Sequence, residues 1–177
     1  MQVKRFIPLL AFAVFALLLW WGLNSNRDIH AINSPLIDKP VPQFQLPLLF
    51  NPQQSADKSE LTGEVTLLNF WGSWCYVCIQ EHPFLTELAS QGVNLVGVNY
   101  RDQRADALEW LGEHGNPFSQ VWADSDGRFA IDMGVYAAPE TYLVDKQGVI
   151  RYKRIGLINQ LVWQQEMEPL YRQLMAE

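Results

Sequence analysis

The sequence predicts an α/β domain, a mixed sheet covered by helices on both faces, preceded by one N-terminal transmembrane helix. Apolar runs with the length of strands alternate with segments of helical spacing between residues 65 and 133, which is typical of parallel strands joined by helices. Two further strands joined by Asp-Lys-Gln-Gly then predict an antiparallel hairpin. A stretch without charges, Phe6–Leu23, precedes all of these elements.

The apolar stretch has the length of a membrane span. Its eighteen residues reach roughly 27 Å as a helix, and Trp20 and Trp21 fall where an interfacial aromatic belt lies. Lys4 and Arg5 precede it, so the positive-inside rule predicts that the rest of the chain is exported. A cleaved signal peptide is the alternative, but no Ala-x-Ala site follows the run.

The chain therefore divides into three parts. Residues 1–23 form the cytoplasmic end and the anchor, and residues 24–42 form a polar linker that contains Pro35, Pro40 and Pro42. Residues 43–177 form the exported domain. Its predicted elements are, in order, an edge strand within 43–50, a short turn at 59–61, a strand at 65–71, a helix at 75–91, a strand at 93–100, a helix at 104–114, a strand at 118–123, a short helix at 126–133, strands at 141–145 and 149–155, and a terminal helix at 161–175.

Two prolines and several apolar residues refine the helices. Pro83 predicts a kink or a break in the helix at 75–91, and Gly92 predicts its left-handed end. In the terminal helix, Pro169 predicts a bend. Its candidate inward residues are Leu161, Met167, Leu170 and Leu174.

Charge and cysteine content exclude several classes of protein. The net charge of −6 comes without a basic stripe, which argues against a nucleic-acid partner. Cys75 and Cys78 are the only cysteines, too few ligands for a metal site, and the three histidines have no metal-binding spacing. A disulfide between them would close too small a loop to be a useful structural staple. We expect no metal and no cofactor.

The two cysteines lie at a predicted strand-to-helix junction. Backbone N–H groups and the helix dipole favour a thiolate there. A Cys-x-x-Cys pair at such a junction is suited to disulfide exchange.

Two separated motifs resemble one family closely. Asn69-Phe-Trp-Gly-Ser-Trp-Cys-Tyr-Val-Cys-Ile-Gln-Glu-His82 and Gly134-Val-Tyr-Ala-Ala-Pro-Glu-Thr-Tyr-Leu-Val-Asp145 are similar to the CcmG/DsbE family of the thioredoxin superfamily, from about Pro35 to the C-terminus. Members are membrane-anchored, periplasmic thiol–disulfide proteins of cytochrome c maturation. The resemblance implies a thioredoxin-like three-layer fold.

The resemblance also implies site residues. Cys75 would be the exposed attacking thiolate and Cys78 the buried resolving thiol. Glu81 and Glu140 match acidic positions near the active site, where a partly buried carboxyl group can relay protons. Each has a plainer interpretation: Glu81 as a solvated helix residue, Glu140 as a structural hydrogen-bond acceptor.

The substrate groove follows from the same motifs. Pro139 would be cis and face the cysteines, and the Ala138 backbone would pair with an extended substrate. Trp74 and Tyr76 would line the groove.

One residue differs from thioredoxin itself, and two features depart from the usual pattern of the family. Asn69 stands where thioredoxin has a buried aspartate, and an amide cannot take up a proton. Tyr76-Val77 replaces a pair that usually contains proline. Ala137 replaces a glycine, which is costly if the backbone there has positive φ.

The sequence thus predicts a thiol–disulfide oxidoreductase held at the bacterial inner membrane by Phe6–Leu23, with its C-terminal domain in the periplasm. We expect it to reduce apocytochrome c before haem attachment, with electrons from a membrane thiol reductase of the DsbD type. The alternatives are a general periplasmic reductase or oxidant with other clients, and a non-catalytic subunit that binds apocytochrome.

Overall fold

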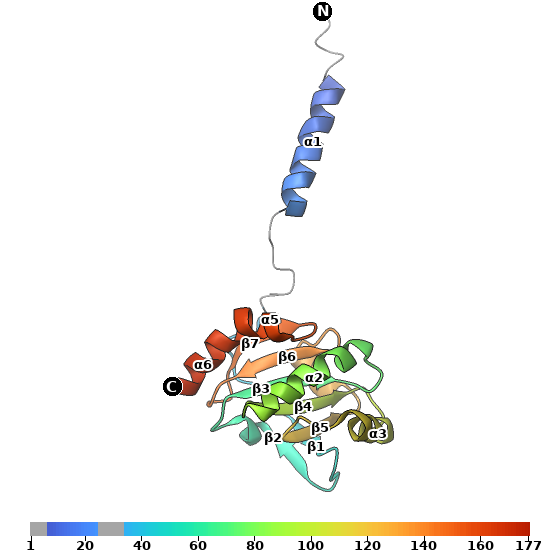
Figure 1. Ribbon diagram of the computed structural model, residues 1–177, viewed down its shortest axis with the longest axis vertical. Coiled ribbons are helices and arrows are strands. Elements are labelled where there is room, and N and C mark those ends of the chain that lie inside the picture. The colour runs from blue at the N-terminus through green and yellow to red at the C-terminus, as the bar shows by residue number, and fades with distance from the viewer. Residues whose placement is uncertain (1–6, 25–33) are drawn as a thin grey trace, which may run out of the picture.

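A five-stranded mixed sheet forms the centre of the domain in the computed structural model, which describes residues 7–24 and 34–177 (Figure 1). The strand order is β5-β4-β3-β6-β7. β3, β4 and β5 are parallel, whereas β6 and β7 are antiparallel to their neighbours. The strands are β3 (Thr66–Trp71), β4 (Asn94–Tyr100), β5 (Gln120–Asp124), β6 (Glu140–Val144) and β7 (Ile150–Ile155). This is the predicted mixed sheet with its terminal hairpin.

Both faces of the sheet are covered, which explains why β3 is apolar without alternation. On one face, Leu67 and Trp71 pack in a cluster with residues of α2, α3 and the C-terminal helices. On the other, Leu68 and Phe70 pack in a second cluster with the short helix α4 and with segments that precede β3. These helices are α2 (Tyr76–Ser90), α3 (Arg104–His114) and α4 (Arg128–Asp132).

Helix α2 runs from Tyr76 to Ser90 without interruption, so the predicted break at Pro83 does not occur. Leu85 and Leu88 are buried against the sheet, and Figure 1 shows the helix crossing over it. Gly92 has φ +85°, the predicted left-handed conformation at the end of the helix.

The C-terminal segment is not the single regular helix that the sequence predicted. It consists of α5 (Gln160–Val162), a π-helical turn η3 (Trp163–Met167) and α6 (Glu168–Ala176). Pro169 has no N–H for the carbonyl of residue 165, so the regular bonding pattern cannot continue there. The wider turn changes which side chains face inward: Trp163 is buried, whereas Leu161 is 60% exposed and was wrongly predicted as a core residue. Met167 and Leu174 are buried as predicted.

The segment before β3 adds a small layer of its own. The predicted edge strand becomes β1 (Gln45–Pro47), which pairs with β2 (Ser55–Asp57) in a separate two-stranded sheet. The sequence did not predict β2. A 3₁₀ turn, η2 (Lys58–Leu61), follows at the predicted turn.

Residues 34–42, at the end of the predicted linker, pack on the domain. Asp38 N–H donates to Ile150 O at 2.8 Å, and Ile150 N–H donates to Lys39 O at 2.9 Å. Arg151 also forms an ion pair with Asp38 at 2.7 Å. The folded domain therefore includes these residues, while residues 25–33 lie outside the described part of the chain.

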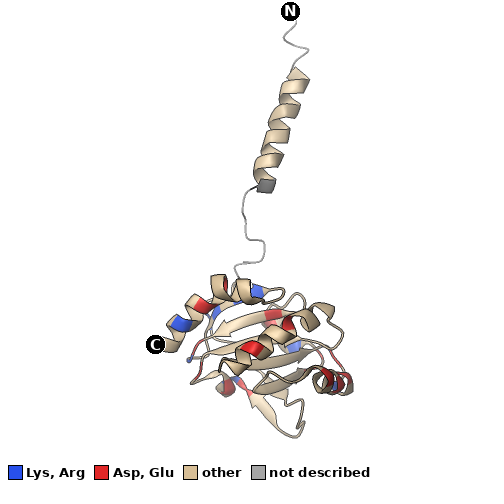
Figure 2. Ribbon diagram, in the orientation of Figure 1, with Lys and Arg blue, Asp and Glu red and all other residues tan. Residues whose placement is uncertain are grey.

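Helix α1 (Ile7–Asn24) coincides with the apolar stretch and stands apart from the domain in Figure 1. Figure 2 shows no charged residue on it, and its large apolar side chains from Ile7 to Trp21 are exposed. Within residues 7–24 and 34–177, no helix is long and apolar enough to cross a membrane. Lys4, Arg5 and Phe6 lie outside the described residues.

Candidate functional site

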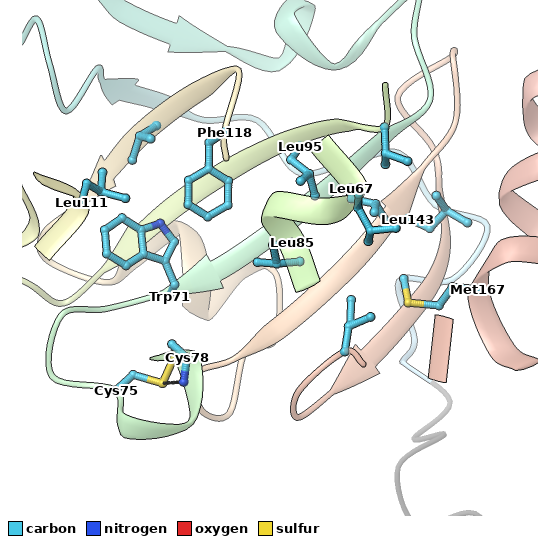
Figure 3. Close-up of a cluster of buried hydrophobic side chains, with 14 of the residues drawn as sticks. Leu67, Trp71, Cys75, Cys78, Leu85, Leu95, Leu111, Phe118, Leu143 and Met167 are labelled. Carbon is cyan, nitrogen blue, oxygen red and sulfur yellow. Dashed lines mark hydrogen bonds between the residues drawn. A yellow bond between two sulfur atoms is a disulfide. The ribbon is translucent and has the colours of Figure 1, made fainter. Parts of the chain in front are cut away.

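The two cysteines lie at the junction between β3 and α2, as predicted. Cys75 is the N-cap of α2, and its Sγ accepts a hydrogen bond from Cys78 N–H at 3.2 Å. The two sulfurs form a disulfide, with Cα atoms 5.3 Å apart (Figure 3). Both residues are 4% exposed, so the expectation that Cys75 is the more exposed is wrong for the disulfide form.

The turn before Cys75 is fixed by one carboxylate. Asp102, which follows β4, accepts hydrogen bonds from Ser73 N–H at 2.6 Å and from Ser73 Oγ at 2.8 Å. Asn99 Nδ2 and Gln103 N–H donate to the same carboxylate, at 2.8 and 2.9 Å. The two bonds from Ser73 hold the cysteine-bearing turn against the end of β4, and the other two orient the carboxylate.

The residues next to the cysteines in the chain have exposed apolar side chains. Tyr76 is 73% exposed, and Trp74, Val77 and Ile79 are exposed as well. Trp74 Nε1–H donates to Tyr100 O at 3.2 Å, which fixes the indole over the end of β4. Trp74 and Tyr76 are thus exposed on either side of Cys75 in the chain.

The loop before β6 contains the predicted cis peptide bond, between Ala138 and Pro139. In the sheet register Phe70 lies opposite Glu140, which places Pro139 beside the end of β3, where the cysteine turn begins. The backbone of Ala138 makes no hydrogen bond to other described residues. Ala137 does not have positive φ, so its Cβ causes no backbone strain.

Glu81 is fully buried, one helical turn beyond Cys78. Its Oε1 accepts Ile158 N–H at 2.9 Å, and its Oε2 accepts Asn69 Nδ2–H at 3.3 Å. Burial raises the pKa of Glu81 to about 7, although both hydrogen bonds oppose the increase. The interpretation of Glu81 as a solvated helix residue is wrong, because α2 turns this side chain toward the sheet.

Asn69 connects Glu81 to the sheet. Its Nδ2 also donates to Thr141 Oγ1 at 2.9 Å, and its Oδ1 has no partner among the described residues. A buried carboxyl group thus lies next to the amide that replaces the aspartate of thioredoxin. This carboxyl group belongs to the helix α2, whereas Asn69 belongs to the strand β3.

Glu140 is also fully buried, but it is engaged as a structural acceptor. Its Oε1 accepts N–H groups of Tyr136 at 2.7 Å and Ala137 at 3.2 Å. Its Oε2 lies 2.9 Å from Lys153 Nζ. The carboxylate therefore holds the loop before Pro139.

The described residues contain no cluster of three or more potential metal ligands. His82 Nε2 lies 3.0 Å from Gly115 O, and its ring packs against Trp110. Burial lowers the pKa of His82. The histidine belongs to the core between α2 and α3.

Sequence reasoning missed three residues of the site: Asp102, Thr141 and Lys153. Thr141 lies inside the second family motif, Gly134–Asp145, so the sequence offered a signal for it. Asp102 and Lys153 lie elsewhere in the chain, and only the strand pairing brings them to the site.

A redox-active cysteine pair on the first turn of a helix, a cis-proline loop beside it and a buried carboxyl group define a thiol–disulfide oxidoreductase of thioredoxin-like fold. The comparisons agree with this class. Residues 37–161 match the Redoxin family.

Relatives and solved structures narrow the class. The thiol:disulfide interchange protein DsbE of Pseudomonas aeruginosa is 46% identical over 97% of this chain and 94% of its own length. The protein of the same name from Escherichia coli is 44% identical over 97% and 95%. A Chlorobium tepidum structure assigned as a DsbE protein is 27% identical, with a TM-score of 0.64 over 74% of this chain and 95% of its own. The chain belongs to the DsbE family of thiol:disulfide interchange proteins.

Proposed function

We propose that this protein reduces the disulfide of an apocytochrome c in the bacterial periplasm, before haem attachment. The observation that carries the proposal is that one chain combines the cysteine pair, the buried Glu81 and the cis-proline loop with 46% identity to a DsbE protein over nearly its whole length. The choice of apocytochrome c as the client rests on the resemblance of both motifs to the CcmG/DsbE family.

The chemistry follows from the two sulfurs. Cys75 thiolate attacks one sulfur of the client disulfide, forms a mixed disulfide and releases the first client thiolate. Cys78 then attacks the Cys75 sulfur, which breaks the mixed disulfide and releases the second client thiolate. The product is the Cys75–Cys78 disulfide that the structure contains. Two electrons from a thiol donor must restore the dithiol, and we propose a membrane reductase of the DsbD type.

The assignment of Cys75 as nucleophile rests on its place at the helix N-terminus. The hydrogen bond from Cys78 N–H and the helix dipole both stabilise negative charge on Cys75 Sγ. Glu81, whose pKa is raised to about 7, accepts the proton that Cys78 must lose before it attacks. Glu140 acts indirectly, through the loop that it holds.

The client binds as an extended segment beside the disulfide. Trp74 and Tyr76 supply exposed apolar contact surface on one side. On the other side, Pro139 shapes the groove and the free Ala138 backbone pairs with the client main chain. We propose that the uncharged apolar stretch Phe6–Leu23 attaches the domain to the inner membrane.

Trapping in cells tests the proposal. Cys78→Ser cannot resolve the mixed disulfide, so a c-type apocytochrome is expected to be disulfide-linked to Cys75. Cys75→Ser is the matched control and is expected to trap nothing. Clients without a Cys-x-x-Cys-His sequence would overturn the assignment of apocytochrome. The reduction potential of the cysteine pair can be measured by equilibration with glutathione. A potential far more oxidising than that of thioredoxin would overturn the proposal that the protein acts as a reductant.

A further inference from the structure

The loop at residues 134–139, here called the cis-proline loop, is tied to the sheet by a buried ion pair. Lys153 Nζ lies 2.9 Å from Glu140 Oε2, and the two side chains are 2% and 0% exposed. Lys153 lies on β7, directly opposite Tyr142 of β6. A lysine is almost never fully buried unless it is paired, so the ion pair with Glu140 accounts for the burial of Lys153.

The pair binds three backbone groups of the loop. Glu140 accepts the N–H groups of Tyr136 and Ala137 through Oε1, and Lys153 Nζ donates to Gly134 O at 2.6 Å. The loop therefore has a donor and an acceptor fixed beneath it, both from rigid strands. Without the lysine, Gly134 O loses its donor, and Glu140 keeps its two N–H donors but loses the cation that balances its charge.

The lysine also contacts the exposed face of the loop. Its Nζ lies 4.9 Å from the centre of the Tyr136 ring and 5.2 Å from that of Tyr142. Tyr142 is fully buried, whereas Tyr136 is 72% exposed, two residues before Ala138. The attraction of a cation to an aromatic face fixes the Tyr136 ring without covering its outer surface.

We propose that Lys153 is a positioning residue for client recognition: it sets the cis-proline loop and the Tyr136 ring against which the segment flanking the client disulfide binds. The inference rests on the proposed function, because it deepens how the same site recognises its client. Replacing a buried ion pair by apolar residues is often neutral for stability. We therefore expect loss of Lys153 to change the orientation of the loop more than the stability of the fold.

Kinetics of the full-length protein test the inference. Two disulfides are compared: a synthetic peptide with an intramolecular Cys-x-x-Cys-His disulfide, which needs the groove, and dithiobisnitrobenzoate, which needs only the thiolate. Lys153→Met is expected to raise KM for the peptide about 10- to 100-fold, while the rate with the small disulfide stays within about twofold. Lys153→Arg keeps a cation and is expected to restore the peptide KM. Lys146→Met, a half-exposed lysine in the β6–β7 turn, is the matched control.

A double variant separates an effect on stability from an effect on client binding. Lys153→Met with Glu140→Gln removes both charges, so thermal stability is expected to recover relative to Lys153→Met alone. The peptide KM is expected to stay raised, because Gly134 O still lacks its donor and Tyr136 its cation. Recovery of KM together with stability would overturn the positioning role, as would equal losses with both disulfides.

Amide hydrogen exchange supplies a readout that needs no client. In Lys153→Met the amides of Tyr136 and Ala137 are expected to exchange at least about tenfold faster, while the Tyr142 amide in β6 is unchanged. Unchanged protection at Tyr136 and Ala137 would refute the inference about Lys153. A wild-type protein that reduces the small disulfide but not the peptide would instead count against the proposed client.

Discussion

The buried carboxyl group of Glu81 makes the stability of this protein depend on pH in a direction opposite to that of an ordinary salt-bridged acid. Its pKa is raised from 4.5 to about 7, and burial is the main cause. The unfolded chain ionises Glu81 near pH 4.5, whereas the folded protein keeps it protonated until about pH 7. Folded protein therefore binds more protons across this window, and its stability falls as pH rises through it.

The size of the effect follows from the two pKa values. The interval between 4.5 and about 7 is worth about 3 kcal/mol at about 1.4 kcal/mol for each pH unit. Typical domains have only about 5–15 kcal/mol of stability in total, so the loss is large enough to measure.

Replacing Glu81 by glutamine should remove this dependence. The Gln carbonyl can accept Ile158 N–H as the carboxylate does, and the free Asn69 Oδ1 can accept the new amide after a flip. Glu81→Gln is therefore expected to have similar stability to wild type near about pH 4.5 and to exceed it by about 3 kcal/mol near about pH 8.

Urea unfolding of the disulfide form across this range is the assay, because neither cysteine titrates in that form. His82, whose pKa is lowered by burial, contributes a trend of opposite sign. It is present in both proteins, so the difference between wild type and variant isolates Glu81. Glu87→Gln, an exposed glutamate on the same helix, is the matched control. A stability difference that stays constant with pH would refute the argument that Glu81 is buried as a neutral acid.

Two further predictions concern the turn that carries the cysteines. Gly72→Ala would place a Cβ 2.5 Å from the Trp74 ring, so we expect the free energy of unfolding to fall by about 1–3 kcal/mol and the fluorescence of Trp74 to change. Gly112→Ala is the control and should not destabilise the protein, because its new Cβ meets nothing within 4 Å. Equal effects of the two substitutions would contradict this. Asp102→Ala leaves Ser73 N–H without its acceptor, so urea unfolding should show a loss of about 1–3 kcal/mol. A change below about 0.5 kcal/mol would mean that water replaces the carboxylate.

Much of the site was available from the sequence because its central parts are local. The spacing of Cys75 and Cys78 and their position after an apolar strand follow from a few neighbouring residues. The proline before β6 was identified by its motif, and the cis bond agrees with the resemblance. The state of the two glutamates was not available, because burial is set by the elements packed against them.

The sequence alone determined the order of the five strands in the central sheet and of helices α2, α3 and α4, the junction that carries the cysteines and the class of chemistry, since each depends on periodicity or on adjacent residues. Only the tertiary structure decided that Glu81 is buried against Asn69 and Ile158, that Glu140 is engaged with Lys153, and that Asp102 holds the cysteine turn. Each of these contacts joins separate elements, which meet only when the strands pair or when α2 packs on the sheet. The charge state of a buried group depends on that packing, and no local pattern encodes it.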